Sequence, residues 1–149
     1  MNKKDDILLI SDLHLSPARP DITAAFYNFL ATRAIHASRL MILGDFFEMW
    51  LGDDMADSLA LEVAARLKTL SESGTTIEFM QGNRDFSIGQ DYADLCGMQL
   101  LPEFYVLHAQ ILLCHGDQLC TLDTGYQRWR KFIRHPLTLW ILRHSPKKF

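Results

Sequence analysis

The chain has 149 residues, of which 48% are hydrophobic and 22% are charged, and its formal net charge at pH 7 is −3. This length and composition are typical of one globular domain with a real hydrophobic core, and they exclude a fibrous or disordered chain. The apolar run LTLWIL is far shorter than the ~20 residues of a membrane-spanning helix, and two aspartates interrupt the apolar start, so we expect neither a transmembrane segment nor a signal peptide.

Three apolar segments are predicted to form buried strands. DILLIS (6–11) and RLMILGD (39–45) are short continuous apolar runs, which are typical of strands covered on both faces. The segment TTIEFMQG (75–82) is predicted to be a third strand. Further along, YVLHAQILLCHG (105–116) contains strand residues and favours a hairpin, although it has no clear turn signal.

Helices are predicted between these strands. One begins near Pro20, which suits the first turn of a helix, and the next ends at Gly74. A shorter helix ends at Gly97, and the segment from Thr124 to Pro136 is predicted to be helical. The apolar residues that define the faces of the first two helices are Ile22, Phe26, Phe29 and Leu30, and Leu59, Val63, Leu67 and Leu70.

The order strand, helix, strand, helix, strand predicts an α/β fold with a largely parallel sheet. In such sheets the ligand crevice lies beyond the carboxyl ends of the strands. Each predicted strand runs into a residue that can bind a metal ion, in the segments ISDLHL, ILGDFFE, FMQGNRD and LLCHGD. Taken singly, GD and GN usually mark turns, and a lone HGD is usually a loop histidine. Their occurrence after four successive strands favours one functional site.

The residue types at these strand ends suit a metal centre. Asp12 and His14 are one residue apart, so on an extended backbone both side chains are expected to project to the same side. Asp45 follows a glycine and can bridge two metal ions ~3.5–4 Å apart. Asn83 offers a neutral carbonyl oxygen, and His115 offers a second imidazole. Oxygen and imidazole ligands without thiolate favour Mn²⁺, Fe or Zn²⁺ over Ca²⁺, and we predict two divalent ions, with Mn²⁺ as our choice.

The ordered set of motifs D-x-H (12–14), G-D-x-x-E (44–48), G-N-R-D (82–85) and H-G-D (115–117) resembles the calcineurin-like metallophosphoesterases. That resemblance implies a two-metal hydrolase built on an αββα sandwich, in which a metal-activated water attacks a phosphoryl centre in line. His115 would be catalytic as well as a metal ligand, and Asp117 would support it.

Most members of that superfamily carry histidine at the position of Arg84. The segments GNRDFSIG and LLCHGDQLCTLDTGYQRWR resemble the family that hydrolyses UDP-2,3-diacylglucosamine to UMP and 2,3-diacylglucosamine 1-phosphate in lipid A biosynthesis. In that reading Arg84 is catalytic and stabilises phosphate charge, because a phosphate leaving group needs charge stabilisation more than protonation. Asn83, Arg84 and Asp123 would contact the substrate. The alternative for Arg84 is a surface ion pair with Asp85 or Glu48.

The superfamily completes its site with a late G-H-x-H motif, and no Gly-His pair occurs in this sequence. We therefore interpret 1–149 as an incomplete metallophosphoesterase domain that lacks the second half of the sandwich, with 124–149 as the start of a helical insertion or lid. We expect less than full activity from this chain alone. Two alternatives remain: another calcineurin-like phosphodiesterase or phosphatase, or a non-catalytic truncated remnant that binds lipid or nucleotide.

The C-terminal segment is basic and aromatic. From Thr121 onward there are seven Lys and Arg against one acidic residue, whereas the preceding part has eight against seventeen. Interleaved cations and aromatic rings favour an anionic membrane surface, and they also suit a nucleic-acid surface or an ordinary packed helix. With a lipid substrate implied, we predict a cytoplasmic protein that is peripheral on the bacterial inner membrane, without nucleic acid or an obligate protein partner. Three cysteines without a CxxC pair predict reduced thiols.

Overall fold

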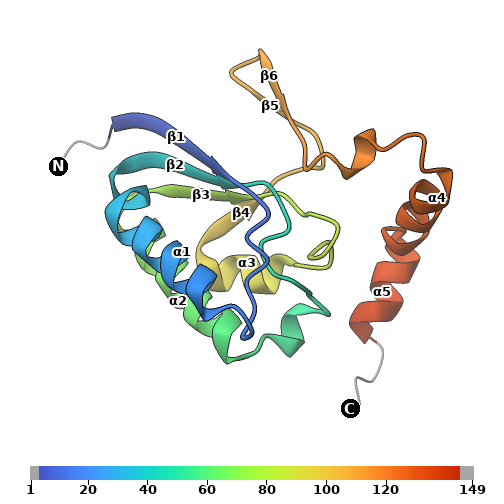
Figure 1. The fold of residues 1–149 in the computed structure, drawn as a ribbon, viewed down its shortest axis with the longest axis horizontal. Helices are drawn as coiled ribbons and strands as arrows, with labels where there is room; N and C mark the ends of the chain where they lie inside the picture. The colour runs from blue at the N-terminus through green and yellow to red at the C-terminus, as the bar shows by residue number, and fades with distance from the viewer. Residues whose placement is uncertain (1–3, 145–149) are drawn as a thin grey trace. The chain divides into compact units, whose positions relative to one another are not determined.

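The structure, a computed structural model, describes residues 4–144. The chain forms two compact units, which divide between His115 and Gly116. The first unit contains the predicted sheet, with its helices and a hairpin, and the second contains the basic C-terminal helices (Figure 1).

The first unit is built on a four-stranded parallel sheet. Its strands are β1 (Lys4–Ile10), β2 (Ala37–Ile42), β3 (Thr76–Phe79) and β4 (Met98–Leu100), hydrogen-bonded in the order β1-β2-β3-β4. All three neighbouring pairs are parallel, so the predicted α/β fold is confirmed. Strand β4 is not predictable from the sequence, because three residues are too few to show a period.

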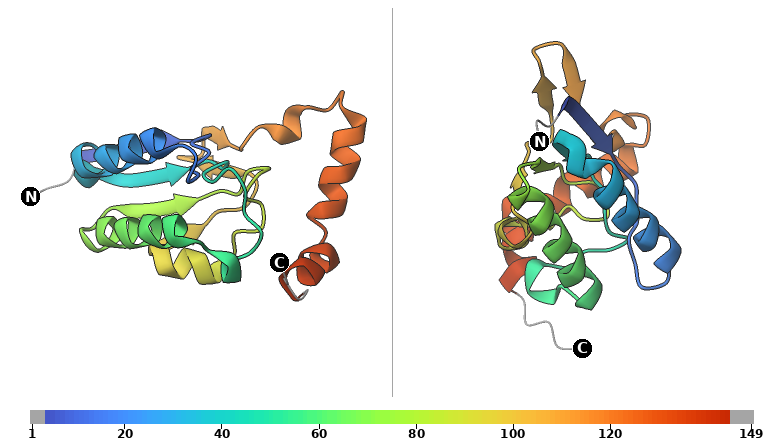
Figure 2. Two further views of the ribbon diagram at one scale, coloured as in Figure 1. Left: turned by 60° about the horizontal axis from the view of Figure 1, so that its bottom comes forward. Right: turned by 90° about the vertical axis from the view of Figure 1, so that its left-hand side faces the viewer.

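Three helices connect the strands and cover one face of the sheet (Figures 1 and 2). They are α1 (Pro20–Thr32), α2 (Ser58–Glu72) and α3 (Gln90–Cys96). Leu40, Ile42 and Phe79 point from the strands into the same core as Phe26 of α1 and Leu67 of α2. Short 3-10 turns, η1 (Ala34–His36) and η2 (Asp53–Met55), complete the connections.

The predicted helix boundaries follow local chemistry. Pro20 is the first residue of α1, where its missing N–H costs nothing. The Asp57 side chain caps α2 by accepting a hydrogen bond from the Ala60 N–H at 2.8 Å. Gly97 ends α3 in the left-handed region at φ 66°, which explains the glycine stop.

The other face of the sheet carries a smaller cluster and a hairpin. Strands β5 (Tyr105–Leu107) and β6 (Ile111–Leu113) pair antiparallel, so the predicted hairpin is confirmed. Leu107 and Leu113 pack with Met41 and Met80 on the side opposite the helices (Figures 1 and 2). The turn places His108 and Ala109 at φ 52° and 58°, without the Asn or Gly that such turns favour. This is why the sequence showed no turn signal.

The second unit is helical. It contains η3 (Asp117–Leu119), α4 (Thr124–Ile133) and α5 (Pro136–His144). Asp123 caps α4 by accepting from the Tyr126 N–H at 2.9 Å, as the sequence indicated. Within this unit, Asp117 Oδ2 accepts from Tyr126 Oη at 2.8 Å and from Arg130 Nε at 2.7 Å. Among the described residues, no helix has the length and apolarity needed to cross a membrane.

Candidate metal centre

The loops that follow β1 and β2 are joined by backbone hydrogen bonds. The Asp12 N–H donates to the Gly44 carbonyl at 3.1 Å, and the His14 N–H donates to the Asp45 carbonyl at 3.0 Å. Leu15 continues the ladder by donating to Phe46 at 2.9 Å. Since β1 and β2 are parallel neighbours, their carboxyl ends meet at one edge, and this ladder extends the pairing into the loops.

Three predicted ligands have a left-handed backbone. Asp12, His14 and Asp45 have φ of 57°, 49° and 50°, a region that non-glycine residues rarely occupy. The expectation that Asp12 and His14 project together from an extended backbone is therefore wrong. Their side chains reach the site because the backbone turns at each residue. Strained backbone of this kind is concentrated at functional sites and is held by the surrounding structure.

Asp85 ties the loop after β2 to the loop after β3. Its fully buried carboxylate accepts from the backbone N–H groups of Gly82 at 2.8 Å, Phe46 at 2.7 Å and Asp45 at 3.2 Å. Burial raises the pKa of Asp85 and the neighbouring Asp45 charge adds to the rise, whereas the backbone hydrogen bonds lower it. In return, Asp45 Oδ1 accepts from the Arg84 N–H at 2.9 Å. The two loops are thus fixed to each other.

His115 has a ring nitrogen whose surroundings suit a cation. Its Nδ1 lies 2.8 Å from the Leu43 carbonyl, which can only accept, so Nδ1 carries the proton. In the neutral ring Nε2 then carries a lone pair and can only accept. The Nε2 atom lies 3.0 Å from Asn83 Oδ1 and 3.5 Å from Asp45 Oδ1. Three acceptor atoms that face one another repel, and a bound cation removes that repulsion. These residues therefore fit the predicted divalent metal ions.

The remaining two predicted ligands lie beside this group. One ligand atom each from Asp12, Asp45 and His115 lie within 4.8 Å of one another. His14 Nε2 is 3.8 Å from Asp45 Oδ2. The structure therefore brings Asp12, His14, Asp45, Asn83 and His115 together at one edge of the first unit. Oxygen and imidazole donors of this kind bind Mn²⁺, Fe or Zn²⁺.

His115 does not follow a strand of the parallel sheet, contrary to the expectation that all the ligands follow such strands. Asp12, Asp45 and Asn83 follow the parallel strands β1, β2 and β3, as expected. His115 instead follows β6, a strand of the antiparallel hairpin that is not part of the parallel sheet. It reaches the centre because the hairpin packs on the sheet through Leu107 and Leu113.

Arg84 forms an ion pair with one of the two carboxylates considered for it. Its Nη1 donates to Glu48 Oε1 at 2.9 Å, and both side chains are about half exposed. Asp85 is not its partner, because that carboxylate is surrounded by backbone N–H groups. Asp123 lies in the second unit, where it caps α4.

Sequence reasoning missed three contributors to the site. The role of Asp85 had a visible signal, because a carboxylate three residues after a loop glycine can accept that glycine's N–H. The sequence placed Glu48 in the G-D-x-x-E motif and offered it as an ion-pair partner of Arg84, but it gave no sign that the second oxygen of Glu48 lies 3.2 Å from His14 Nδ1. The Leu43 carbonyl, which sets the His115 tautomer, has no signal in any side chain.

The chain is similar to known proteins over most of its length. It is 53% identical over 143 residues to "UDP-2,3-diacylglucosamine hydrolase" of Pseudomonas entomophila (strain L48), covering 94% of this chain and 60% of that protein. It is 54% identical over 143 residues to the protein of the same name from Pseudomonas savastanoi pv. phaseolicola, of which it covers 58%. No protein-family model matches the chain. The chain thus spans about 60% of the length of these curated relatives.

A solved structure has a similar fold. The crystal structure of Pseudomonas putida nuclease MPE matches with a TM-score of 0.53 at 24% sequence identity, covering 68% of this chain and 50% of that one. At this identity the likeness concerns the fold alone. The evidence for homology comes from the sequence comparison. Over 94% of its length, this chain is a homologue of proteins named UDP-2,3-diacylglucosamine hydrolase.

Proposed function

We propose that this chain provides metal- and phosphate-binding residues of an enzyme that hydrolyses the pyrophosphate bond of UDP-2,3-diacylglucosamine. The products would be UMP and 2,3-diacylglucosamine 1-phosphate, in lipid A biosynthesis. One observation carries the proposal: the acceptor atoms of Asp45, Asn83 and His115 converge within a segment that is about 53% identical to proteins named for that substrate.

In this proposal each side chain has a defined task. Asp12, His14, Asp45, Asn83 and His115 would hold two divalent ions, for which Mn²⁺ is our choice. When bound, such ions would supply Lewis-acid stabilisation of phosphoryl charge and lower the pKa of a bound water. The Leu43 carbonyl keeps the Nε2 lone pair of His115 available by holding the proton on Nδ1.

Arg84 would bind the phosphate oxygens of the substrate. Its guanidinium is half exposed beside Glu48, so a phosphate can reach its other N–H donors from solvent. Arginine stays cationic at every physiological pH and can bind two phosphate oxygens at once. We assign Asn83 and Asp123 as further substrate contacts, and we propose that 124–149 begin a helical lid.

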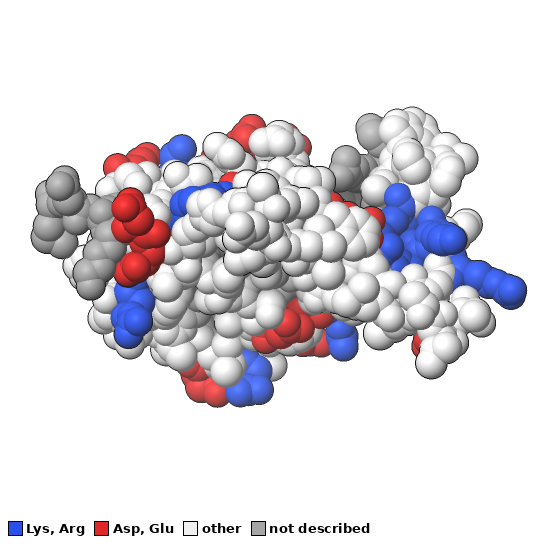
Figure 3. Space-filling view, turned by 90° about the horizontal axis from the view of Figure 1, so that it is seen from above, with Lys and Arg blue, Asp and Glu red and all other residues white. Residues whose placement is uncertain are grey.

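The second unit suggests how the chain would reach a lipid substrate. Trp129 and Phe132 are exposed on α4, three residues apart on one side, and Arg128 and Lys131 are exposed beside them. In the view of Figure 3, Lys and Arg side chains gather around this helix. Exposed rings and cations on one helix suit the interface of an anionic membrane, so we propose peripheral attachment to the cytoplasmic face of the inner membrane.

The test of the proposed function is UMP release from UDP-2,3-diacylglucosamine, with the chain supplied in excess and Mn²⁺ present. We expect metal-dependent release that is lost in Asp45→Asn and kept in Asp91→Asn, a control on the exposed side of α3. Hydrolysis of cyclic nucleotides without UMP release would instead indicate another phosphodiesterase. Absence of both reactions, together with calorimetric binding of no metal ion, would indicate a non-catalytic remnant.

Membrane attachment is tested separately by liposome flotation. We expect the chain to float with vesicles that contain anionic phospholipid and to remain unbound with neutral vesicles. The double variant Trp129→Ser/Phe132→Ser should lose flotation, whereas Leu61→Ser, an exposed apolar residue of α2 in the first unit, should not. Flotation that is indifferent to anionic lipid would contradict this proposal.

A further inference from the structure

Glu48 lies between the metal-binding and phosphate-binding residues. Its Oε1 accepts from Arg84 Nη1 at 2.9 Å, and its Oε2 lies 3.2 Å from His14 Nδ1. The other ring nitrogen of His14, Nε2, faces Asp45 Oδ2 at 3.8 Å. The imidazole is therefore placed between two carboxylates, with Glu48 on one side and a predicted metal ligand on the other.

The His14 ring depends on Glu48 for its orientation. Nδ1 of His14 is shielded from solvent and makes no hydrogen bond of standard geometry, so the Glu48 carboxylate at 3.2 Å is the contact available to it among the described residues. A proton on Nδ1 is attracted by the negative charge of that carboxylate, and it leaves the Nε2 lone pair free on the side of Asp45. A carboxylate behind a metal-binding histidine has this effect in many sites, and its removal commonly weakens metal binding 10–100-fold.

The backbone holds Glu48 in this place. The Glu48 N–H donates to the Leu15 carbonyl at 3.1 Å, in the loop that carries His14. Two residues on, the Trp50 N–H donates to the Arg84 carbonyl at 3.2 Å, so the same segment is tied to both loops. The adjacent Phe47 and Trp50 are buried and stack on each other with ring centroids 4.9 Å apart.

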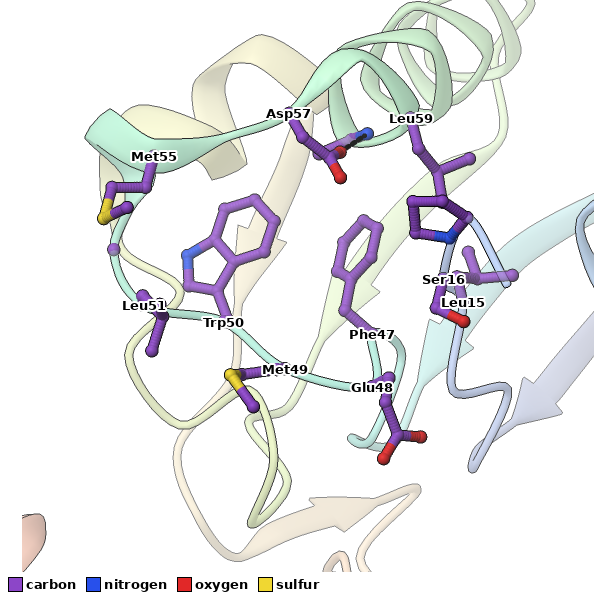
Figure 4. Close-up of a pocket in the computed structure, with 13 residues that line it drawn as sticks. Leu15, Ser16, Phe47, Glu48, Met49, Trp50, Leu51, Met55, Asp57 and Leu59 are labelled. Carbon is purple, nitrogen blue, oxygen red and sulfur yellow. Dashed lines mark hydrogen bonds between the residues drawn. The ribbon is translucent and has the colours of Figure 1, made fainter. Parts of the chain in front are cut away.

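Figure 4 shows the consequence for the side chain: the Phe47 and Trp50 rings line an apolar pocket, while the Glu48 carboxylate points away from them. The chain bends at Glu48, so its side chain leaves the backbone on a different side from the two rings. The buried rings therefore act as anchors that direct Glu48 toward His14 and Arg84.

We propose that Glu48 is a positioning residue of this site, which orients His14 for a metal ion with one oxygen and holds Arg84 beside it with the other. This inference rests on the proposed function, because it assigns Glu48 a task toward the metal ion and the phosphate. It also has a consequence that holds without metal: in the free chain, neutral His14 carries its proton on Nδ1.

The first test measures that tautomer in the metal-free chain by ¹⁵N NMR of the histidine rings, at a pH where imidazole is neutral. We expect an Nδ1-protonated His14 in the wild-type chain and a shift toward the Nε2-protonated form in Glu48→Ala. Glu48→Gln retains the side-chain volume and should give an intermediate population. An unchanged His14 tautomer in Glu48→Ala would overturn the proposal, whatever the metal does.

The second test measures Mn²⁺ affinity by calorimetry in a double-mutant cycle with His14→Ala. We expect Glu48→Ala to weaken Mn²⁺ binding about tenfold, and to have no further effect once His14 is absent. The matched control is Glu62→Ala, because Glu62 forms an equally exposed ion pair with Arg66 at 2.9 Å on α2. An equal loss in both backgrounds would overturn the proposal, since Glu48 would then act through its charge alone. A wild-type chain that binds no Mn²⁺ but shows the expected tautomer would instead contradict the proposed function.

Discussion

The backbones of Gly44 and Gly82 are in direct contact. A Cβ built on Gly44 would lie 2.5 Å from the Gly82 Cα, and a Cβ on Gly82 would lie 2.2 Å from Asp45 Oδ1. No other residue type leaves room for the two loops that carry the proposed metal ligands to approach this closely. The contact explains why GD and GN follow successive strands.

We therefore expect Gly82→Ala to push the Asp45 loop away from the Asn83 loop. Overpacking of this kind should lower the free energy of unfolding by about 2 kcal/mol and weaken Mn²⁺ binding about tenfold. Urea unfolding and calorimetry measure the two effects. Gly125→Ala is the matched control, because a Cβ there meets its nearest neighbour at an ordinary 3.5 Å. Equal Mn²⁺ affinity in the two variants would show that this contact does not shape the centre.

Metal binding should stabilise the folded chain. Mn²⁺ at a hundredfold excess over its dissociation constant is expected to raise the free energy of unfolding by about 2.7 kcal/mol, and chelation should reverse the gain. His115→Ala should abolish most of this response because it removes the Nε2 acceptor from the centre. His36→Ala, an exposed histidine in η1, should leave it intact. The measurement is the shift in melting temperature that Mn²⁺ causes in each variant. A full shift in His115→Ala would mean that Mn²⁺ binds at a site that does not include His115.

The ion pair between Arg39 and Glu78 should matter more for stability than exposed pairs do. Both guanidinium nitrogens Nε and Nη2 donate to the carboxylate, at 2.6–3.0 Å, and Glu78 is buried. We expect Glu78→Leu to lower the free energy of unfolding by about 2 kcal/mol, because it leaves the partly buried Arg39 charge without its carboxylate and with only the Tyr105 hydroxyl as an acceptor.

The double variant Arg39→Met/Glu78→Leu should recover most of that loss, since it removes the unpaired charge as well. Urea unfolding of the wild type and the three variants measures the coupling. The exposed Glu62–Arg66 pair provides a comparison, for which a change below about 1 kcal/mol is expected. A double variant as unstable as Glu78→Leu would refute this explanation.

The hairpin turn carries strain that glycine would relieve. His108 and Ala109 both have a left-handed backbone, in the turn type that favours Asn-Gly. We expect His108→Asn/Ala109→Gly to raise the free energy of unfolding by about 1 kcal/mol. Gly97→Ala, at another left-handed position, should change stability in the opposite direction. A less stable double variant would show that the turn is held by contacts rather than strained.

Burial controls the reactivity of Cys96. It raises the pKa of the Cys96 thiol to about 12, so at pH 8 a thiol reagent should modify exposed Cys120 and leave Cys96 unmodified until the chain unfolds. The folded thiol keeps its proton at a pH where the unfolded one, with a pKa of ~8.5, loses it. Ionisation of Cys96 therefore leaves the free energy of unfolding unchanged below about pH 8.5. It lowers that free energy progressively as the pH rises toward 12.

Between pH 7 and pH 10 the free energy of unfolding should fall by about 2 kcal/mol more in the wild-type chain than in Cys96→Ala. Urea unfolding of both proteins at the two pH values measures the difference. Identical pH dependence in the two proteins would show that Cys96 is not the group responsible.

The sequence by itself determined most of the helices and strands and the residue types that gather at the candidate site. Apolar runs and the residues at helix ends, such as Pro20, Gly74 and Gly97, are local signals, because burial and backbone conformation act on each segment separately. The gathering of Asp12, Asp45 and Asn83 was also readable, since parallel strands β1, β2 and β3 end at one edge.

Only the tertiary structure decided how these residues meet. The N–H donors around Asp85 and the contact of Glu48 with both His14 and Arg84 join segments that are far apart in the chain. The left-handed backbone at Asp12 and His14 likewise accompanies hydrogen bonds to Gly44 and Asp45 in another loop. A hydrogen bond to a carbonyl, such as that of His115 to Leu43, leaves no trace in side-chain identity. Such contacts depend on how the loops are packed together, and that packing is set by the whole core rather than by any one motif.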